Sequence, residues 1–354
     1  MLEAGERVGG RVWSAPVAGG TVVELGGEFV LPGYETLTAI AGRLGLALRE
    51  KGTLYGNREP RGGPPVTRSE VAAVAASLSA STGSLTDALA ALPPGPREAI
   101  ASRLAVSTAY ELEDQPASIL ADGAAGFGDF PSYSVEHGNS ALAEALAAPL
   151  EVRLASRARD VAWSESGVHV DGIDTDAAVI ALPAPATLAL RFEPALPAWK
   201  QEALGAVRYG QAAKLFLSLS EPVEPSATLS VPGRFWTWTE HGRAVASAFV
   251  GTRSALDRLA VADGPERFAE EVRRLRPDLP YAAAEPLLAT WPEGAYSART
   301  ISSPLDDEAL ARRIGPLAFA GEHTAGPWHA LMEGALRSGL RAVADLLGYD
   351  SPAP

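Results

Sequence analysis

The chain places an acidic residue, Glu3, a few positions before the sequence Gly9-Gly10-Arg11. In a nucleotide-binding βαβ unit, an acidic residue ends the second strand about 20 residues after a G-x-G-x-x-G turn and binds the ribose hydroxyls. The chain contains no G-x-G-x-x-G, and only two residues precede Glu3. We therefore expect the later part of such a fold, truncated at its N-terminus so that the first strand, turn and helix are missing.

The length and charge of the chain restrict its class. A globular chain of 354 residues is more typically two domains than one. The net charge of −13 argues against nucleic-acid binding, which requires a basic face. No apolar run reaches the roughly 18 residues of a membrane span, and no secretory leader is recognisable. We expect a cytoplasmic protein that binds neither nucleic acid nor membranes.

The cysteine and histidine content excludes several kinds of site. Cysteine is absent, so disulfides, thiolate catalysis and cysteine–metal sites are excluded. The histidines show no metal-binding spacing such as H-E-x-x-H; they are His137, His169, His241, His323 and His329. We expect no metal site.

Helical and strand-rich blocks interleave along the chain, which predicts an α/β fold whose two domains are each built from separated segments. The predicted helices cover 35–50, 69–79, 84–92, a segment after 96, 141–148, 266–275 and 331–347. Ser140 is a plausible N-cap for the helix at 141–148. Residues 21–30 are predicted to form a strand that runs into a Gly-Gly turn and a second extended piece, and further strands are predicted at 152–154, 158–163, 168–170, 177–182, 212–219 and 317–320.

Short motifs near both ends of the chain occur in a fixed order. They are Leu2-Glu3-Ala4, Arg7-x-Gly9-Gly10-Arg11 and Leu25-Gly26-Gly27, then Val179–Pro183, Lys214 and Gly294-Ala-Tyr296, and finally Phe319-Ala-Gly321-Glu322-His-Thr324 and Met332-Glu333-Gly334-Ala335-x-x-Ser338-Gly339. Together they resemble the signatures of flavin-containing amine oxidases, which include monoamine, polyamine and L-amino-acid oxidases. The resemblance extends over essentially the whole chain.

The resemblance implies a two-domain architecture. A Rossmann-like FAD-binding domain of the amine oxidase type would comprise residues 1–60, 130–212 and 287–354, without its first βα unit. A substrate domain of mixed sheet and helices would comprise residues 61–129 and 213–286.

The resemblance also implies a set of cofactor-binding residues. Glycines 9 and 10 permit close approach of a ligand to the backbone, and the Arg11 guanidinium suits phosphate oxygens. The alternative for this motif taken alone is an ordinary turn with a surface arginine. Because Ala295 stands where covalently flavinylated members carry cysteine, FAD is expected to bind non-covalently. The implied cofactor-binding residues are Glu3, Arg7, Gly9, Gly10, Arg11, Gly26, Gly27, Ala158, Gly321, Glu322 and Met332.

Three residues are implied in catalysis: Lys214, Tyr296 and Trp328. A lysine in the apolar strand Ala-Ala-Lys-Leu-Phe-Leu is costly to bury without a partner, and in the family the matching lysine holds a water against flavin N5. The alternative is a strand lysine whose ammonium reaches the surface. Tyr296 and Trp328 match positions near the substrate amine. Trp236 and Trp238 either line the pocket or pack in the core.

The implied activity is oxidation of an amine by hydride transfer to flavin N5, with O2 as electron acceptor and an imine and H2O2 as products. The partners would be a small-molecule amine and O2. The alternative hypothesis is a truncated or degenerate relative that does not hold FAD firmly and is non-catalytic or binds a protein partner. The identity of the amine stays open, since the chain offers many arginines, Arg234 among them, that could bind an amino-acid carboxylate.

Overall fold

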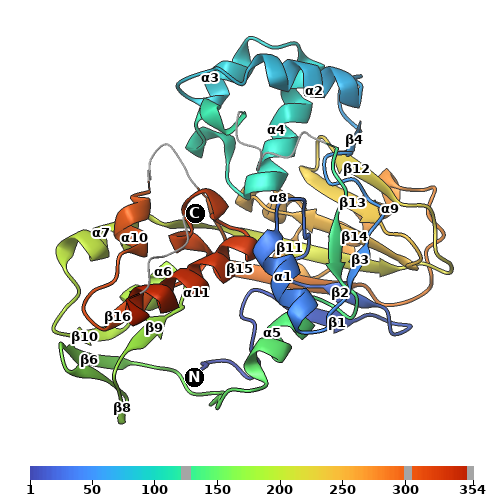
Figure 1. The fold of residues 1–354 in the computed structure, drawn as a ribbon. Helices are drawn as coiled ribbons and strands as arrows, with labels where there is room; N and C mark the ends of the chain where they lie inside the picture. Colours follow the sequence, from blue (N-terminus) through green and yellow to red (C-terminus); the bar gives the residue numbers. More distant parts are fainter. Residues whose placement is uncertain (121–128, 299–304, 349–354) are drawn as a thin grey trace.

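A computed structural model describes residues 1–120, 129–298 and 305–348, with the side chains of 292–298 left undescribed. Its largest element is a six-stranded sheet in the order β15-β11-β14-β13-β12-β4 (Figure 1). All neighbouring strands are antiparallel except β4 and β12. The strands are β4 (Glu59–Arg61), β11 (Arg208–Ser218), β12 (Ser226–Ser230), β13 (Phe235–Thr239), β14 (Val245–Val250) and β15 (Leu287–Ala298).

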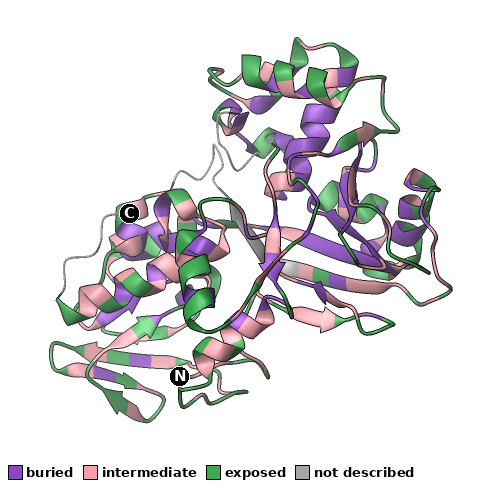
Figure 2. Cartoon of the chain, turned by 45° about the vertical axis from the view of Figure 1, so that its right-hand side comes forward, coloured by how far each residue is buried: buried purple, intermediate pink, exposed green. Residues whose placement is uncertain are grey.

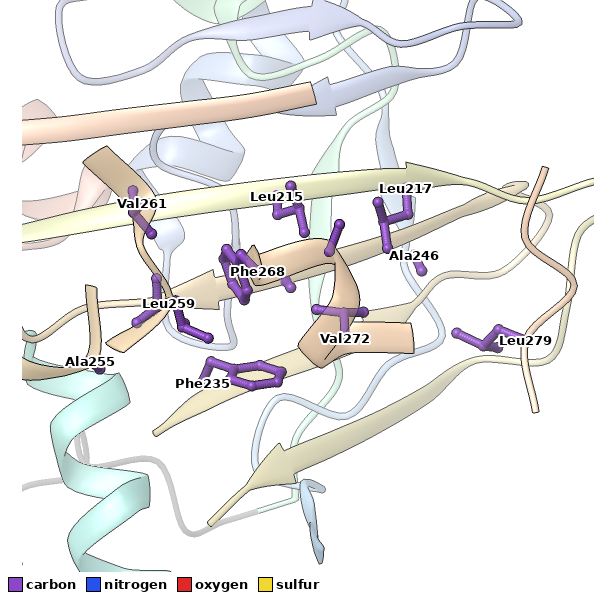
Figure 3. Close-up of a cluster of buried hydrophobic side chains, with 14 of the residues drawn as sticks. Leu215, Leu217, Phe235, Ala246, Ala255, Leu259, Val261, Phe268, Val272 and Leu279 are labelled. Atoms are coloured by element: carbon purple, nitrogen blue, oxygen red, sulfur yellow. The ribbon is translucent and has the colours of Figure 1, made fainter. Parts of the chain in front are cut away.

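The centre of this sheet is covered on both faces. Every residue of β13 and β14 is buried, so the strands show no alternation between buried and exposed positions. On one face lie α8 (Arg253–Arg258) and α9 (Glu266–Leu275), whose Phe268 and Val272 are fully buried (Figure 3). The predicted amphipathic helix at 266–275 is therefore confirmed, because its apolar side packs against the sheet.

A small helical layer lies above the sheet in Figure 1. Its helices are α2 (Arg68–Ser77), α3 (Leu85–Ala90) and α4 (Pro94–Thr108), followed by the 3₁₀ turns η1 (Leu112–Asp114) and η2 (Ala117–Leu120). Thr67 and Glu70 form a capping box at the start of α2. Helix α4 is the most deeply buried of the three and contacts β12 and β13.

The other half of the molecule consists of smaller sheets and helices. Its sheets are the parallel pair β9 (Ala178–Ile180) and β16 (Leu317–Phe319), and the four strands β10 (Arg191–Glu193), β6 (Asp160–Ser164), β7 (Gly167–Val170) and β8 (Ile173–Thr175). The helices are α6 (Ala184–Leu188), α7 (Ala198–Ala206), α10 (Asp307–Ala311) and α11 (Met332–Leu347).

Small residues on α11 allow close packing at Gly334 and Ala342. Ala342 is fully buried against Ala318 and Ala320 of the β16 segment. A Cβ added at Gly334 would lie 2.0 Å from the carbonyl oxygen of Trp328. The helix therefore packs through a glycine and alanine face that larger side chains would not fit.

Short N-terminal elements join the two halves. The hairpin β1 (Ser14–Pro16) and β2 (Val22–Glu24) packs its apolar residues on the six-stranded sheet. Nearby are α1 (Glu35–Arg43), α5 (Ser140–Ala147), and the pair β3 (Leu48–Glu50) and β5 (Tyr133–Val135). Leu2 forms a single parallel bridge with Arg153.

The α/β class is confirmed, but several local predictions were wrong. The helix predicted over 35–50 ends at Arg43, since Gly45 takes a left-handed φ of 72° and 48–50 pairs as a strand. The predicted strand at 152–154 is reduced to the one bridge at Arg153. Ser140 begins its helix and Asn139 occupies the N-cap position.

The predicted division into domains stays a prediction. That division assigned residues 287–298 to the FAD-binding domain. In the structure these residues form β15, an edge strand of the six-stranded sheet.

Candidate functional site

The Gly9-Gly10 segment forms a turn that its glycines permit. Their φ angles are 95° and 55°, in the region that favours glycine. The Arg7 guanidinium donates hydrogen bonds to the carbonyl oxygens of Val8, Gly10 and Val12, at 3.1, 2.6 and 3.0 Å. Arg7 therefore holds the turn from inside, whereas a Cβ on Gly10 would meet nothing within 4 Å.

Arg11 brings the N-terminal turn to the C-terminal motif. Its guanidinium forms an ion pair of 2.8 Å with Glu322, more than 300 positions away, and lies 5.6 Å from the ring centroid of Tyr209. Burial raises the pKa of Tyr209 to about 12, with the Glu322 charge adding to the effect. The phenol therefore stays neutral beside this ion pair.

The Gly26-Gly27 turn packs against the same loop. The amide of Gly27 donates to the carbonyl oxygen of Arg11 at 2.9 Å, and a Cβ on Gly26 would lie 2.0 Å from that oxygen. A Cβ on Gly27 would lie 3.2 Å from the sulfur of Met332. The two loops thus meet at a distance that only glycine allows at position 26, and the Met332 side chain packs closely on Gly27.

Glu3 contacts the segment that precedes β6, in which Ala158 lies. The Glu3 carboxylate accepts a hydrogen bond of 2.7 Å from the amide of Gly5, and the Glu3 carbonyl accepts one from Ser156. Ala158 lies two residues beyond Ser156, in the loop that leads to β6.

The Gly321-Glu322 motif is fixed by contacts with α11. Gly321 has a φ of 124°, and its amide donates to the Ser338 hydroxyl at 2.9 Å. The second carboxylate oxygen of Glu322 accepts a hydrogen bond of 2.9 Å from the amide of Ala330. Burial lowers the pKa of the neighbouring His323 to about 4, so its ring is neutral at pH 7.

Lys214 is buried and fully engaged. Its ammonium donates to the carbonyl oxygens of Glu24 and Gly26, at 2.8 and 2.7 Å, and pairs with the Glu28 carboxylate at 2.5 Å. Only 5% of the residue is exposed. The alternative of a lysine that reaches the surface is therefore wrong, and the cost of burial is offset by an anion and two carbonyls.

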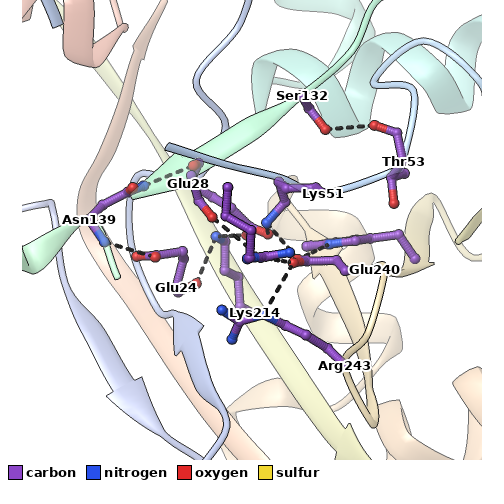
Figure 4. Close-up of polar contacts among 12 residues, drawn as sticks. Glu24, Glu28, Lys51, Thr53, Ser132, Asn139, Lys214, Glu240 and Arg243 are labelled. Atoms are coloured by element: carbon purple, nitrogen blue, oxygen red, sulfur yellow. Dashed lines mark hydrogen bonds and ion pairs between the residues drawn. The ribbon is translucent and has the colours of Figure 1, made fainter. Parts of the chain in front are cut away.

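A chain of charges extends from Lys214 into the protein (Figure 4). The other oxygen of Glu28 pairs with Lys51 at 2.9 Å, Lys51 pairs with Glu240 at 2.5 Å, and Glu240 pairs with Arg49 at 2.5 Å. Burial opposes ionisation of Glu240, but the charges of Lys51 and Arg49 prevail and lower its pKa to about 2. We call Lys214, Glu28, Lys51, Glu240 and Arg49 the ionic chain.

Glu24 lies beside the ionic chain, and its pKa is shifted in the opposite direction to that of Glu240. Burial raises its pKa to about 7, against the effect of hydrogen bonds from the Ser14 hydroxyl and the Asn139 amide. The Asn139 side chain donates to the carbonyl oxygens of Gly27 and Glu28, at 3.0 and 2.8 Å, and so fixes the Gly26-Gly27 turn. Its Oδ1 atom accepts a hydrogen bond of 2.9 Å from the amide of Val135, so this oxygen does not cap the helix.

A cavity of about 110 Å³ adjoins the Gly27 turn. Trp236 and Trp238 stack at 4.2 Å between ring centroids, and Phe29 packs on both at 5.6 Å. Both tryptophans line this cavity and also belong to a buried hydrophobic cluster, so the two alternatives from the sequence apply together. The described lining residues are Gly27, Glu28, Phe29, Leu31, Tyr34, Tyr55, Arg58, Val106, Ser107, Lys214, Trp236, Trp238, Phe249, Ala330, Leu331 and Met332.

The roles predicted for Trp328 and Tyr296 near the substrate stay predictions, and Trp328 is not among the described residues that line the cavity. The Trp328 ring packs edge-on against Tyr34 at 6.1 Å and beneath the Arg337 guanidinium, and Leu331 lines the cavity. Tyr296 pairs with Gly210 through the backbone of β15, while its side chain lies outside the described residues.

Sequence reasoning missed Glu28, Lys51, Glu240 and Arg58. Only Lys51 carried a signal in the sequence: the chain has three lysines, so Lys51 was unusual in the same way as Lys214. Their partners lie far apart along the chain, and no spacing rule connects them.

The chain matches one known family over most of its length. The family model described as flavin containing amine oxidoreductase matches residues 1–93 and 77–347. The chain therefore belongs to the flavin-containing amine oxidoreductase family, a family of oxidoreductase enzymes. Over the described residues, no helix is long and apolar enough to cross a membrane. Within the same residues, no group of three or more histidine and acidic side chains could hold a metal ion.

Individual relatives agree with this assignment. Polyamine oxidase 3 of Oryza sativa subsp. japonica is 29% identical over 56% of this chain and 46% of its own length. The L-amino-acid oxidase of Naja atra is 27% identical over 49% of this chain and 38% of its own length. The chain thus spans less than half the length of these curated relatives.

Solved structures share the fold. Cyclohexylamine oxidase from Brevibacterium oxydans IH-35A superposes with a TM-score of 0.78 at 18% identity, covering 98% of this chain and 92% of that one. Putrescine oxidase bound to putrescine gives 0.76 at 21% identity, covering 98% and 93%. At these identities the likeness concerns the fold.

Proposed function

We propose that the chain is an FAD-dependent oxidoreductase that oxidises the C–N bond of a small-molecule amine. The observation that carries the proposal is the meeting of Arg11, Gly27, Glu322 and Met332 beside a cavity with aromatic walls. These residues come from both ends of the sequence, and the cavity shares Gly27 and Met332 with their contact. A cofactor held there would adjoin a substrate held in the cavity.

The residues present fit FAD. Arg11 is 27% exposed at its side chain and has the fork geometry for phosphate oxygens, while Gly10 leaves open space above the turn. Glu3 and Glu322 are carboxylates suited to ribose hydroxyls. The first residues of α11 offer a positive helix end. We propose that the chain binds FAD non-covalently through this set.

Bound FAD would supply the acceptor for the hydride that leaves the carbon beside the amine, with O2 as the final acceptor and an imine and H2O2 as products. The chain's own residues orient the amine and exclude water. Trp236, Trp238 and Phe29 form an apolar wall that favours a neutral amine. Glu28 and two carbonyls hold the Lys214 ammonium at the cavity, where we propose that it acts in catalysis.

The test is reconstitution of the full chain with FAD, followed by amine-dependent H2O2 release in a peroxidase-coupled assay. We expect Lys214→Met to slow amine oxidation or flavin reoxidation at least about tenfold, as loss of one preorganised polar group does. Lys214→Arg, which keeps a charge, is the comparison variant. Unchanged kinetics in Lys214→Met would remove Lys214 from the site, and no peroxide with any amine would remove the activity.

A second candidate is a chain that holds FAD weakly. It is favoured by the β9–β16 pair, which is two strands wide, and by exposed apolar side chains on α11, where Leu340 is 51% exposed. The absorbance of the purified protein between 350 and about 500 nm, where flavins absorb, separates the candidates. A colourless protein that gains no flavin on incubation with FAD supports the second, and a stoichiometric yellow complex excludes it.

A further inference from the structure

All three N–H groups of the Lys214 ammonium are engaged within the described part of the chain. An ammonium group has three N–H donors and no acceptor. Lys214 directs them to the carbonyl oxygens of Glu24 and Gly26, at 2.8 and 2.7 Å, and to a carboxylate oxygen of Glu28 at 2.5 Å. A water or a substrate in the cavity can therefore accept a hydrogen bond from Lys214 only if one of these contacts breaks.

The contact with Glu28 is the one that a side-chain movement could release, because the other two acceptors are backbone carbonyls. Glu28 is held from its other side, since its second carboxylate oxygen pairs with Lys51 at 2.9 Å and Lys51 pairs with Glu240 at 2.5 Å (Figure 4). The Glu28 and Lys51 side chains are 4% and 1% exposed. Releasing one partner of a buried pair leaves a charge uncompensated, which is strongly unfavourable. The Glu28 carboxylate therefore stays on Lys214.

The backbone acceptors of Lys214 belong to a turn that neighbouring residues hold. The Asn139 side chain donates to the carbonyl oxygens of Gly27 and Glu28, at 3.0 and 2.8 Å, and the amide of Gly27 donates to the carbonyl oxygen of Arg11. The backbone of Lys214 lies in β11, between β14 and β15. The lysine is thus anchored at one end by a sheet and at the other by this turn, so its charge keeps a fixed position beside the cavity.

Two other buried lysines show what a carboxylate partner does to an ammonium in this protein. Lys200 donates to three carbonyl oxygens at the end of α10, and burial lowers its pKa to about 7. Burial also opposes the charge of Lys51, but the charges of Glu240 and Glu28 prevail and raise its pKa. Glu28 therefore supplies more than an acceptor, because its negative charge stabilises the ammonium groups that it contacts.

We propose that Lys214 acts at the cavity as a fixed positive charge, without donating a hydrogen bond to a water, and that Glu28 is the positioning residue that enforces this. The inference rests on the proposed function and deepens it. It differs from the role that the family resemblance implies for the lysine, which is to hold a water. A fixed cation stabilises negative charge that develops beside it, such as the charge that a hydride brings to its acceptor, without any movement of its own.

The first experiment observes the lysines directly and requires no FAD. The chain has three lysines, so the full chain labelled with ¹⁵N-lysine gives three side-chain ammonium signals in NMR spectra, which single substitutions assign. The spectra are recorded at a pH below about 7, where Lys200 is also protonated. We expect the Lys214 ammonium to exchange its protons with water slowly, like that of Lys200, because three acceptors hold each group. Exchange as fast as that of free lysine would overturn the proposal.

Substitution of Glu28 tests its positioning role in the same spectra. Glu28→Gln keeps the size of the side chain and removes its charge. We expect proton exchange at Lys214 to become about tenfold faster, since a charge-assisted hydrogen bond is replaced by a weaker one, while the Lys200 signal stays unchanged. The control Glu144→Gln alters an exposed carboxyl on α5 and should change none of the three signals. Unchanged exchange at Lys214 in Glu28→Gln would contradict the role of Glu28.

The second experiment measures the reduction potential of FAD bound to the protein, by titration with a redox dye. Lys214→Met should lower this potential by about 30 mV, which is a tenfold change in the equilibrium constant of a two-electron couple, and Lys214→Arg should restore most of it. Glu28→Gln should raise the potential, because it removes a negative charge. A general loosening of the site would shift the potential of both variants in the same direction and would overturn the proposal, as would an unchanged potential in Lys214→Met.

These outcomes are separable from those of the proposed function. Slow exchange at Lys214 that depends on Glu28, in a protein that oxidises no amine, would support this inference and contradict the function. Amine-dependent peroxide release from a protein whose Lys214 exchanges rapidly would do the reverse. Melting temperatures show whether each variant is folded, and if Glu28→Gln is not, proton exchange in the unaltered chain decides.

Discussion

The six-stranded sheet and the β9–β16 region differ in how completely they bury themselves. The strands β13 and β14 are buried at every residue, and helices cover the sheet (Figure 2). In the other region, Val179 of β9 is 41% exposed, and Leu340 and Val343 of α11 are 51% and 48% exposed. Apolar area removed from water is the main source of stability, so the sheet is expected to hold its structure more independently.

The polar contacts of the two regions differ in the same way. The ionic chain on the sheet side is buried and links five side chains, whereas Arg11 and Glu322 form one ion pair that is partly exposed. Isolated ion pairs near the surface add little stability. We therefore infer that the six-stranded sheet, the proposed substrate side, is preformed, and that the β9–β16 region, the proposed cofactor side, would gain much of its order from bound FAD.

The largest expected effect is on the ionic chain. Lys51→Met would leave Glu28 and Glu240 with less compensation inside the protein, and removing one partner of a buried pair typically costs about 3–5 kcal/mol. Urea denaturation measures the loss. The control is Arg274→Met, whose ion pair with Glu271 is exposed and should contribute at most about 1 kcal/mol. Equal losses of unfolding free energy in the two variants would contradict the expected difference between buried and exposed ion pairs.

Binding of FAD should stabilise β16 and α11 more than β13 and β14. FAD at 100 times its Kd would stabilise the protein by about 2.7 kcal/mol. Hydrogen exchange followed by mass spectrometry should show slower exchange in β16 and α11, with little change in β13 and β14. Uniform slowing across both regions would contradict the inference that the cofactor side is the dependent one.

A substitution at the junction should affect both regions. Gly26→Ala places a Cβ 2.0 Å from the Arg11 carbonyl oxygen, and such overpacking costs about 1–3 kcal/mol. We expect weaker FAD binding as well, measured by fluorescence titration. The matched control is Gly42→Ala near the end of α1, where nothing lies within 4 Å and a gain of about 0.4–1 kcal/mol is typical. Unchanged stability and FAD affinity in Gly26→Ala would show that the two loops are not tightly packed.

The last expected effect concerns pH and is spread over several pH units. The pKa of Glu24 is raised from 4.5 to about 7, so between these values the folded protein binds a proton that the unfolded chain releases. This group therefore contributes less stability as pH rises through that window, by at most about 1.4 kcal/mol per pH unit.

The measurement is the free energy of unfolding from pH 4.5 to 7.5 for the protein and for Glu24→Gln. The advantage of the variant should grow with pH through this range. The exposed Glu144→Gln serves as control and should run parallel to the unaltered protein. A difference that does not vary with pH for Glu24→Gln would mean that this carboxyl titrates normally.

Local signals in the sequence were sufficient for much of the fold. The helices at 266–275 and 331–347 follow the apolar period and agree with α9 and α11. The helix at 35–50 was extended too far because Gly45 gave a weak stop signal, and the pairing of 48–50 with β5 is a long-range contact. Boundaries that depend on a distant strand are not visible in local periodicity.

The candidate site likewise has features set by local sequence and features set by long-range contacts. By itself, the sequence determined the positions that need glycine and the motifs at both ends, because backbone φ and close approach are local requirements on residue type. The tertiary structure alone decided that Arg11 meets Glu322, that Lys214 is paired with Glu28, and that Arg58 lines the cavity. The reason is physical: the energy of a buried charge depends on its distance to partners that only folding brings near.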